Sequence, residues 1–343
     1  MGEAVRFGIR IPPCGELTEV ARVVKAAEDA GFDTAWIPDS QLLWRDVWAA
    51  LAVAATATSR IRLGTCVTNF ATRHPTVTAA AAATTAELAP GRFVLGVGTG
   101  DSAVRTVGLP RVRLAAMREH LRLVRTLLDG GEVIGADGRV VRLMSVPKTR
   151  VPIYLAVSGP RTCRLAGELC DGTIGSAMNP AAIARTRGWV AEAAAAVGRD
   201  PAEVEICVHA QCHPADDPAA VTRLVKPFLV HHAQLAGRKA VREAYGIDID
   251  PPAHIPGIHP DMGHAMDWGA AVEVAGQWVS DEAAARYAAG FVIGRPAELA
   301  AKFQSAVDAG ARSFYIRHLG SYTFPTELIE VLGEWVIPNV AVR

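Results

Sequence analysis

The stretch RFVLGVGTGDSAVRTVGLP, residues 92–110, decides between two folds. A short apolar run leads into Gly98-Thr-Gly-Asp-Ser-Ala103, which fits the G-x-G-x-x-[GA] fingerprint of a dinucleotide-binding Rossmann domain. In such a domain the fingerprint opens a helix of several turns and usually lies in the first βαβ unit. Here Gly108 and Pro110 follow so soon that only about one helical turn fits. The pattern therefore disfavours a nicotinamide dinucleotide site.

Apolar strand-like segments alternate with helical segments along the chain. The strand-like segments are 5–11, 34–40, 61–67, 92–97, 151–157, 171–177, 204–210 and 313–319. The clearest helical segments are 16–30, 45–58, 76–88, 113–128, 181–197, one from about 219, 296–309 and 326–335. Eight such units predict an α/β fold, a (β/α)₈ TIM barrel, and the near-continuous apolar strands fit a parallel sheet buried on both faces. A doubly wound sheet is the alternative.

The prediction treats residues 1–343 as a single barrel domain. A long insertion, 237–292, separates strands seven and eight, and it is rich in Pro, Gly and His. We expect it to form a loop-rich cap over the barrel mouth, where the active sites of such barrels lie.

The composition is that of an ordinary globular protein. Half of the 343 residues are hydrophobic, and 35 basic side chains balance 35 acidic ones, so neither nucleic acid nor a membrane surface is expected as a partner. No apolar run is long enough to span a bilayer, and the N-terminal residues lack the pattern of a signal peptide. The six cysteines form no C-x-x-C pair. We expect a cytoplasmic enzyme with free thiols.

Two strand ends carry acids at the expected mouth. Gly98, Thr99 and Gly100 let the backbone approach a flat ring after strand four, and Asp101 follows them. The alternative for this segment is a tight βα loop without a ligand. Asp39 follows strand two, where Pro38-Asp39-Ser40 could equally form a plain Asx turn.

Several separated motifs resemble the bacterial luciferase-like superfamily. They are AEDAGFDTAWIPD, TSRIRLGTCVTNFATRHPTVTAAAAATTAELAPGRFVLGVGTGD, VPIYLAVSGPRTCRLAGELCDGTIGS and the closing WVIPNV. The resemblance covers roughly residues 5–200 and returns at the end of the chain. It implies a TIM barrel that binds FMN or the deazaflavin coenzyme F420, and it is strongest to the F420 branch that includes methylenetetrahydromethanopterin reductase.

The resemblance also implies roles for individual residues. Cys66, Val67, Thr68 and Asn69 end strand three, where deazaflavin members often carry a bulge with a non-proline cis peptide against the ring. Cys66–Val67 is the candidate bond and Asn69 a candidate partner of the ring's polar edge; an ordinary trans strand end is the alternative. Asp39 lies where the family contacts the ring or the substrate.

Proton transfer is assigned by the same resemblance. Asp101 aligns with a glutamate proposed as proton donor in an F420-dependent sugar-phosphate dehydrogenase of the family. His74 is a second candidate, because imidazole titrates near neutrality, although it could merely begin a helix. The sugar-phosphate enzyme has a histidine after its strand-two aspartate, whereas this chain has Ser40, which argues against a sugar-phosphate substrate.

The phosphate end of the cofactor is expected at strands five and six. Ser158 and Gly159 close strand five, and Gly175, Ser176 and Ala177 close strand six before a helix. Backbone N–H groups at a helix start favour an anion, and the Ser176 hydroxyl would add a donor. The alternative is a simple helix cap.

The insertion holds His254, His259, His264, Asp261 and Asp267. Their spacing matches no common zinc pattern, so no metal is expected, and the histidines are read as substrate-facing or surface groups. His231 and His232 are similarly ambiguous, and Trp44, Trp48 and Trp268 could wall a pocket or belong to the core.

The function predicted from these observations is hydride transfer between F420 and a small organic substrate. The first alternative is an FMN-dependent monooxygenase that works with a separate flavin reductase. The second is a non-catalytic flavin-binding member of the family. The resemblance also implies a homodimer.

Overall fold

A computed structural model describes residues 4–342; residues 1–3 and 343, the ends of the expected domain, lie outside the described part. Its centre is a closed barrel of eight parallel strands, because β12 pairs with both β10 and β1. The barrel strands are β1 (Arg6–Arg10), β2 (Thr34–Ile37), β3 (Arg62–Thr65), β5 (Phe93–Gly98), β8 (Ile153–Ala156), β9 (Gly172–Ala177), β10 (Glu205–Pro214) and β12 (Ser313–Arg317). The predicted TIM barrel is confirmed, and the doubly wound alternative is wrong because the sheet has no open edge between β1 and β12.

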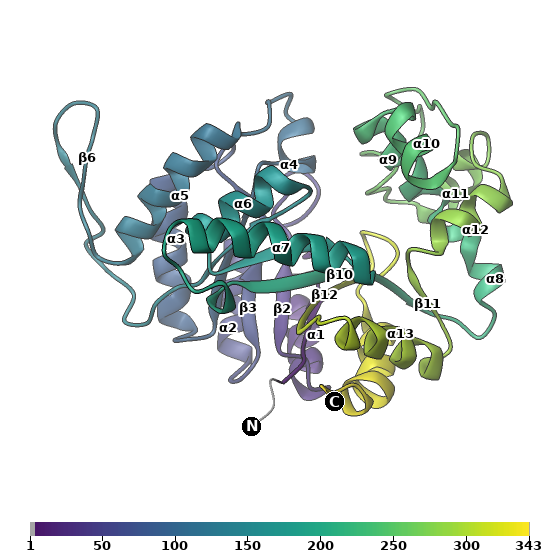
Figure 1. The fold of residues 1–343 in the computed structure, drawn as a ribbon, viewed down its shortest axis with the longest axis horizontal. Coiled ribbons are helices and arrows are strands. Elements are labelled where there is room, and N and C mark those ends of the chain that lie inside the picture. The colour runs from purple at the N-terminus through teal and green to yellow at the C-terminus, as the bar shows by residue number, and fades with distance from the viewer. Residues whose placement is uncertain (1–3, 343) are drawn as a thin grey trace.

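Helices surround the barrel and bury one face each against it (Figure 1). They are α1 (Leu17–Asp29), α2 (Val47–Ala57), α3 (Pro75–Leu88), α5 (Leu114–Leu128), α6 (Pro160–Leu169), α7 (Pro180–Ala196), α13 (Pro296–Asp308) and α14 (Thr326–Val331). In α1, for example, Val20, Val24 and Ala27 are buried at helical spacing. The barrel helix after β10 is α13, because the helix expected from about residue 219 lies in the insertion.

The barrel interior is filled by large side chains below the mouth. Trp36, Tyr154, Cys207 and Tyr315 form a buried cluster there. Trp36 occupies space that a side chain at position 64 would need, since a Cβ on Gly64 would lie 2.4 Å from its ring. The barrel interior at this level is thus packed with side chains rather than open.

The segment between β10 and α13 forms a separate lobe beside the mouth (Figure 1). It contains α8 (Pro218–Val221), α9 (Lys226–Ala236), α10 (Arg238–Tyr245), α11 (Trp268–Ala275), α12 (Asp281–Ala288) and β11 (Val292–Gly294). Its own apolar core begins at Val225 and includes Leu229 and Val230 of α9. The lobe therefore starts before residue 237 and has more helix than its Pro and Gly content suggested.

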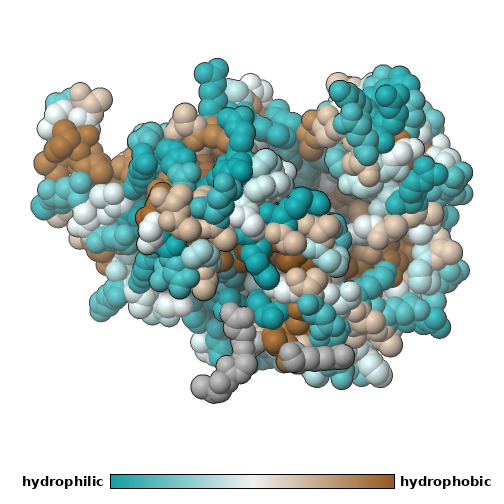
Figure 2. All heavy atoms as spheres, viewed as in Figure 1, coloured by the Kyte–Doolittle hydropathy of each residue, from teal (hydrophilic) through white to brown (hydrophobic). Residues whose placement is uncertain are grey.

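A hairpin of β6 (Val133–Ile134) and β7 (Val140–Val141) projects from the other side of the barrel (Figure 1). Its apolar side chains are exposed, Ile134 by 69% and nearby Met144 by 84%, and Figure 2 shows an apolar patch on it. Within residues 4–342, no helix has the length and apolar character required to cross a membrane.

Candidate active site

A cavity of about 290 Å³ lies at the carboxyl ends of the barrel strands. Its walls come from all eight barrel strands or the residues directly after them, and from the insertion, which contributes His264. Among the sequence-predicted residues, the cavity is lined by Asp39, Cys66, Val67, Asn69, Gly100, Asp101 and Gly175. The structure thus brings together residues that are as much as 136 positions apart in the chain (39 to 175).

The end of strand three forms a bulge. The Cys66–Val67 peptide bond is cis, which confirms the predicted bond, and the chain then forms β4 (Thr68–Asn69) beside β5. Gly98 is required at this point, because a Cβ there would lie 2.7 Å from Val67 Cγ2. Burial raises the pKa of the Cys66 thiol to about 12, so this cysteine lines the cavity as an uncharged group.

Asp39 is the buried acid of the cavity. Thr68, fully buried, donates a hydrogen bond from Oγ1 to Asp39 Oδ2 at 2.7 Å, and Arg73 Nε lies 3.5 Å from the same oxygen. Burial raises the pKa of Asp39 above the ordinary aspartate value despite the opposing effects of Thr68 and Arg73. Asp39 is therefore well suited to hold a proton, and Thr68 orients it rather than lining the cavity.

Asp101 has the opposite electrostatic character. Its Oδ1 accepts hydrogen bonds from Arg105 Nε at 3.1 Å and Arg111 Nη2 at 3.2 Å, and its side chain is 46% exposed. Burial would raise its pKa, but Arg105, with smaller effects of His231, His264 and Arg111, leaves the pKa below its usual value. A carboxylate held ionised in this way is a poor proton donor, so the geometry disfavours the predicted role of Asp101 as the proton donor.

The fingerprint glycines lead into a very short helix. α4 (Ser102–Arg105) has four residues, which fits the rejection of a Rossmann site. Gly98 is buried in β5, and the Thr99 carbonyl accepts the N–H of Val112. Only Gly100 of these three residues lines the cavity, with a φ of +97°.

His74 and Ser176 are among the sequence-predicted residues that do not line the cavity. His74 is exposed and caps α3, with Nδ1 in contact with Thr76, a geometry that does not favour the predicted catalytic role. Ser176 is buried and donates its hydroxyl to Thr186 Oγ1 at 3.1 Å. Its side chain points toward α7, a geometry that does not favour the predicted binding of phosphate by this hydroxyl.

The predicted phosphate site is only partly supported. The N–H groups of Ser158 and Gly159 both donate to Thr162 Oγ1 within the first turn of α6, so these donors are already used. Gly175, with a φ of +123°, lines the mouth cavity. Ala177 lines an adjoining cavity of about 630 Å³, which shares His209 and Arg317 with the mouth cavity.

Sequence reasoning missed Arg10 and Arg317 and left His264 of the insertion ambiguous between a substrate-facing and a surface group. Arg10 lies in the first strand and lines the cavity; the available signal was a charge near the end of the apolar run 5–11. His264 also lines it, and its Nδ1 lies 3.0 Å from Asp261 Oδ1. Trp44, previously ambiguous, lines the cavity beside His264 with a ring separation of 5.8 Å.

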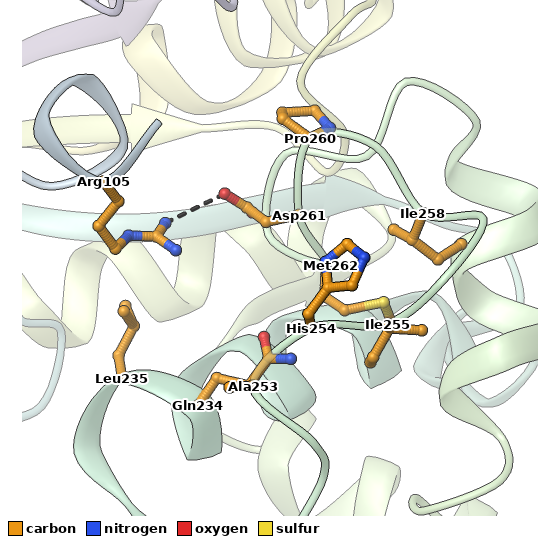
Figure 3. A pocket seen from close by; sticks show the side chains of 10 residues that line it. All are labelled: Arg105, Gln234, Leu235, Ala253, His254, Ile255, Ile258, Pro260, Asp261 and Met262. Atoms are coloured by element: carbon orange, nitrogen blue, oxygen red, sulfur yellow. Dashed lines mark hydrogen bonds and ion pairs between the residues drawn. The ribbon is translucent and has the colours of Figure 1, made fainter. Parts of the chain in front are cut away.

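Asp261 connects the insertion with the barrel. Arg105 Nη2 donates to its Oδ2 at 3.1 Å, as Figure 3 shows in a neighbouring cavity of about 240 Å³. His231, Asp261 and His264 each place one potential metal ligand within 4.8 Å of the others. The Arg105 guanidinium competes with a cation for the carboxylate, and burial lowers the pKa of His231 to about 4. Asp261 is therefore already engaged by Arg105 and by His264, which disfavours a metal ion at this cluster.

The comparisons with known proteins agree with this architecture. Residues 5–313 match the luciferase-like monooxygenase family. The 5,10-methylenetetrahydromethanopterin reductase of Methanolobus tindarius is 31% identical over 310 residues, covering 89% of this chain and 91% of that protein.

Solved structures show the same fold. The F420-dependent tetrahydromethanopterin reductase of Methanopyrus kandleri has a TM-score of 0.74 and 25% identity, with 98% of this chain and 99% of that chain covered. The FMN-bound oxygenating constituent of 3,6-diketocamphane monooxygenase from Pseudomonas putida has a TM-score of 0.69 and 17% identity, and covers 99% of both chains.

The closed parallel barrel with its polar mouth cavity defines the class of the protein, a (β/α)₈-barrel enzyme. Within that class, the chain belongs to the luciferase-like monooxygenase family and is an oxidoreductase.

Proposed function

We propose that this enzyme transfers a hydride between coenzyme F420 and a small organic substrate held in the mouth cavity. The observation that carries the proposal is the cavity itself. Gly100, Ala156 and Gly175 give it walls of backbone and small side chains, against which a planar ring can lie, and the buried acid Asp39 stands beside them. The reductase relatives support F420 over FMN.

The residues around the cavity fit a deazaflavin. When bound, this coenzyme supplies or accepts a hydride at its ring carbon. Val67 and the Cys66–Val67 backbone would support one ring face, and Asp39 would contact the polar edge. Asn69 uses its Oδ1 to accept the N–H groups of Ala71 and Thr72, which leaves its amide nitrogen as the donor toward the ring.

The phosphate-bearing chain would extend toward Ala177 and the adjoining cavity. Lys302 lines that cavity, and its Nζ donates to the Ile293 carbonyl at 2.8 Å, without an acidic partner among residues 4–342. Because the Lys302 ammonium group has only a neutral partner, an anionic group bound beside it would be stabilised by its charge. We therefore place the phosphate beside Ala177 and Lys302 rather than at Ser158 and Gly159.

Proton exchange with the substrate is assigned to His264. Asp261 holds its Nδ1, and Nε2 makes no hydrogen bond within the described residues, so this nitrogen is available in the cavity. Asp101 acts through Arg105, which contacts both Asp101 and Asp261. In this assignment Asp101 is a positioning residue, and the lobe that carries His264 caps the substrate.

The alternative functions differ from the proposed one in the coenzyme that is bound and in whether oxygen is consumed. An FMN-dependent monooxygenase with a separate reductase would bind FMN and consume oxygen in step with substrate. The test is to screen small alcohols and carbonyl compounds with F420, following coenzyme absorbance and dissolved oxygen together. We expect coenzyme turnover at the same rate with and without oxygen. Turnover that needs FMN and oxygen would overturn the proposal, and binding without turnover of any compound would favour a non-catalytic protein.

We also propose a cytoplasmic homodimer. The free thiols of Cys14, Cys66, Cys163, Cys170, Cys207 and Cys212 fit a reducing compartment. Sedimentation equilibrium tests the oligomeric state: a mass of twice 36.3 kDa is expected, and a monomer would contradict the proposal.

A further inference from the structure

Arg10 is a buried cation that faces the mouth cavity. It is the last residue of β1, its exposed fraction is 2%, and its guanidinium carbon lies 4.9 Å from the centre of the Trp44 ring. Its Nη1 has no hydrogen-bond partner, and no carboxylate in residues 4–342 forms an ion pair with it. A guanidinium removed from water without a counter-charge is costly, so a compensating ligand is expected.

Arg317 places a second cation beside the first. β1 and β12 are paired in register with Ile9 opposite Ile316, so Arg10 and Arg317 follow on adjacent strands. Arg317 lines the same cavity, and its Nε also lacks a hydrogen-bond partner within the described residues. Burial, and then the charge of Arg317, lower the pKa of Arg10 to about 10, which leaves it charged at neutral pH.

The acids that line the cavity do not neutralise these two arginines. Asp39 is paired with Arg73, and Asp101 with Arg105 and Arg111. His209, which also lines the cavity, is neutral, because burial and Arg317 lower its pKa to about 3. The part of the cavity next to β1 and β12 therefore has two positive charges, neutral neighbours and room for a ligand.

We propose that Arg10 and Arg317 form an anion-binding site, and that it holds a carboxylate or phosphate group of the substrate. The substrate of this oxidoreductase would then be an organic acid or a phosphate ester. This substrate class rests on the proposed function, whereas the anion site follows from the two arginines alone. Planar guanidinium groups suit both anions because they offer paired N–H donors.

The coenzyme itself carries a phosphate, which is the other source of an anion. Lys302 and Ala177 offer that phosphate a place in the adjoining cavity, which Arg317 also lines, whereas Arg10 lines only the mouth cavity. Arg10 lies on the strand beside β2, with its guanidinium carbon 4.9 Å from the centre of the Trp44 ring, and that ring lies 5.8 Å from the His264 ring. An anion on Arg10 would thus hold the substrate within reach of the proposed proton-exchanging group.

Calorimetric titration with oxalate and with inorganic phosphate tests the site. The variants are Arg10→Gln, Arg317→Gln and the charge-conserving Arg10→Lys, with Arg22→Gln on the exposed side of α1 as the matched control. We expect the wild type to bind at least one of the two probes, and each Gln variant to bind that probe at least tenfold more weakly. Arg10→Lys should bind it with intermediate affinity. Arg22→Gln should bind it as tightly as the wild type does. Circular dichroism checks that each variant is folded.

Titration with F420 separates the two sources of the anion. The proposal expects F420 affinity to change less than threefold in Arg10→Gln, because Arg10 does not line the adjoining cavity assigned to the coenzyme phosphate. A loss of F420 affinity with no effect on either probe would assign the arginines to the coenzyme and overturn the proposal. Probe affinities equal in wild type and in both Gln variants would also overturn it. If the wild type binds the probes through the arginines but does not bind F420, the proposed function fails while the anion site stands.

Discussion

Asp261 accepts a hydrogen bond from Arg105 at 3.1 Å, which joins the insertion to the loop after β5. The same carboxylate holds His264, so one residue connects the lobe, the barrel and the imidazole that faces the cavity. The ionised state of Asp261 is favoured, because His264, His231 and Arg105 lower its pKa far below the usual value although burial acts to raise it. The position of His264 therefore depends on a charge network that spans both parts of the chain.

Asp261→Asn should loosen this connection. The substitution removes the negative charge that Arg105 and His264 share, and we expect a loss of about 1–3 kcal/mol in the free energy of unfolding. Hydrogen exchange should rise in residues 259–267 before it rises in the barrel strands. Asp267→Asn, which alters only the cap of α11, is the control and should leave exchange near His264 unchanged. Equal exchange in Asp261→Asn and wild type would contradict the role of this network.

His264→Asn should slow turnover by about 100-fold, the usual scale for a lost acid–base group. F420 affinity should stay within a few-fold of wild type, because His264 belongs to the insertion rather than to the ring-binding strands. His254→Asn, an exposed histidine of the same insertion, should have full activity. The variants are compared by their steady-state rates with the substrate found by screening. Full activity of His264→Asn would show that His264 does not exchange a proton with the substrate.

Asp101→Asn should have a smaller effect than His264→Asn. Asp101 is half-exposed and touches Arg105 and Arg111, so its removal disturbs Arg105 without removing a reacting group. We expect turnover of Asp101→Asn to fall less than about tenfold. The double variant Asp101→Asn/His264→Asn should be no slower than His264→Asn alone. A larger fall in Asp101→Asn than in His264→Asn would restore Asp101 as the acid.

The stability of Asp39→Asn relative to the wild type should increase as the pH rises. The pKa of Asp39 is raised in the folded protein, so the wild type loses stability as the pH rises from the unfolded value, about 3.9, through the higher folded value. The amide has no such loss. Urea unfolding from about pH 4 to about pH 8 should show the variant gaining relative to the wild type. A constant or falling difference would contradict the assignment; the exposed Asp216→Asn serves as the control.

Thr68→Val should raise the pKa of Asp39 further. The Thr68 hydroxyl donates to the Asp39 carboxylate and so favours its ionised form. Carbon NMR of the carboxyl group should show a higher midpoint in the variant, and stability should fall by about 1 kcal/mol. Thr84→Val, on the exposed face of α3, is the control. An unchanged or lower midpoint would show that Thr68 does not set the state of Asp39.

The fold was predictable because its causes are local. Apolar runs of strand length, alternating with helices such as α1 and α5, required a buried parallel sheet, and Gly108 and Pro110 excluded a long helix after the fingerprint. The strand ends also predicted where the mouth residues Asp39 and Val67 lie. These features depend on spacing along the chain, which the sequence records directly.

The site was less predictable because side-chain direction depends on tertiary packing. Ser176 and Gly175 are neighbours in β9, but Gly175 lines the cavity while Ser176 points toward α7. Arg10 and Arg317 are far apart in the chain and become adjacent only through the β1–β12 pairing. His264 reaches the cavity because the insertion has its own core, which no short motif announced.

The most direct test of the account is a fluorescence titration of F420 into wild type and into Ala156→Phe. Ala156 is a small side chain on the cavity wall, and a phenyl group there would fill the space assigned to the ring. Ala195→Phe, on the exposed side of α7, is the matched control. The account predicts saturable binding of one F420 per chain in wild type and control, and a loss of at least tenfold in affinity in Ala156→Phe. Equal affinity in all three proteins, or binding of FMN alone, would contradict it.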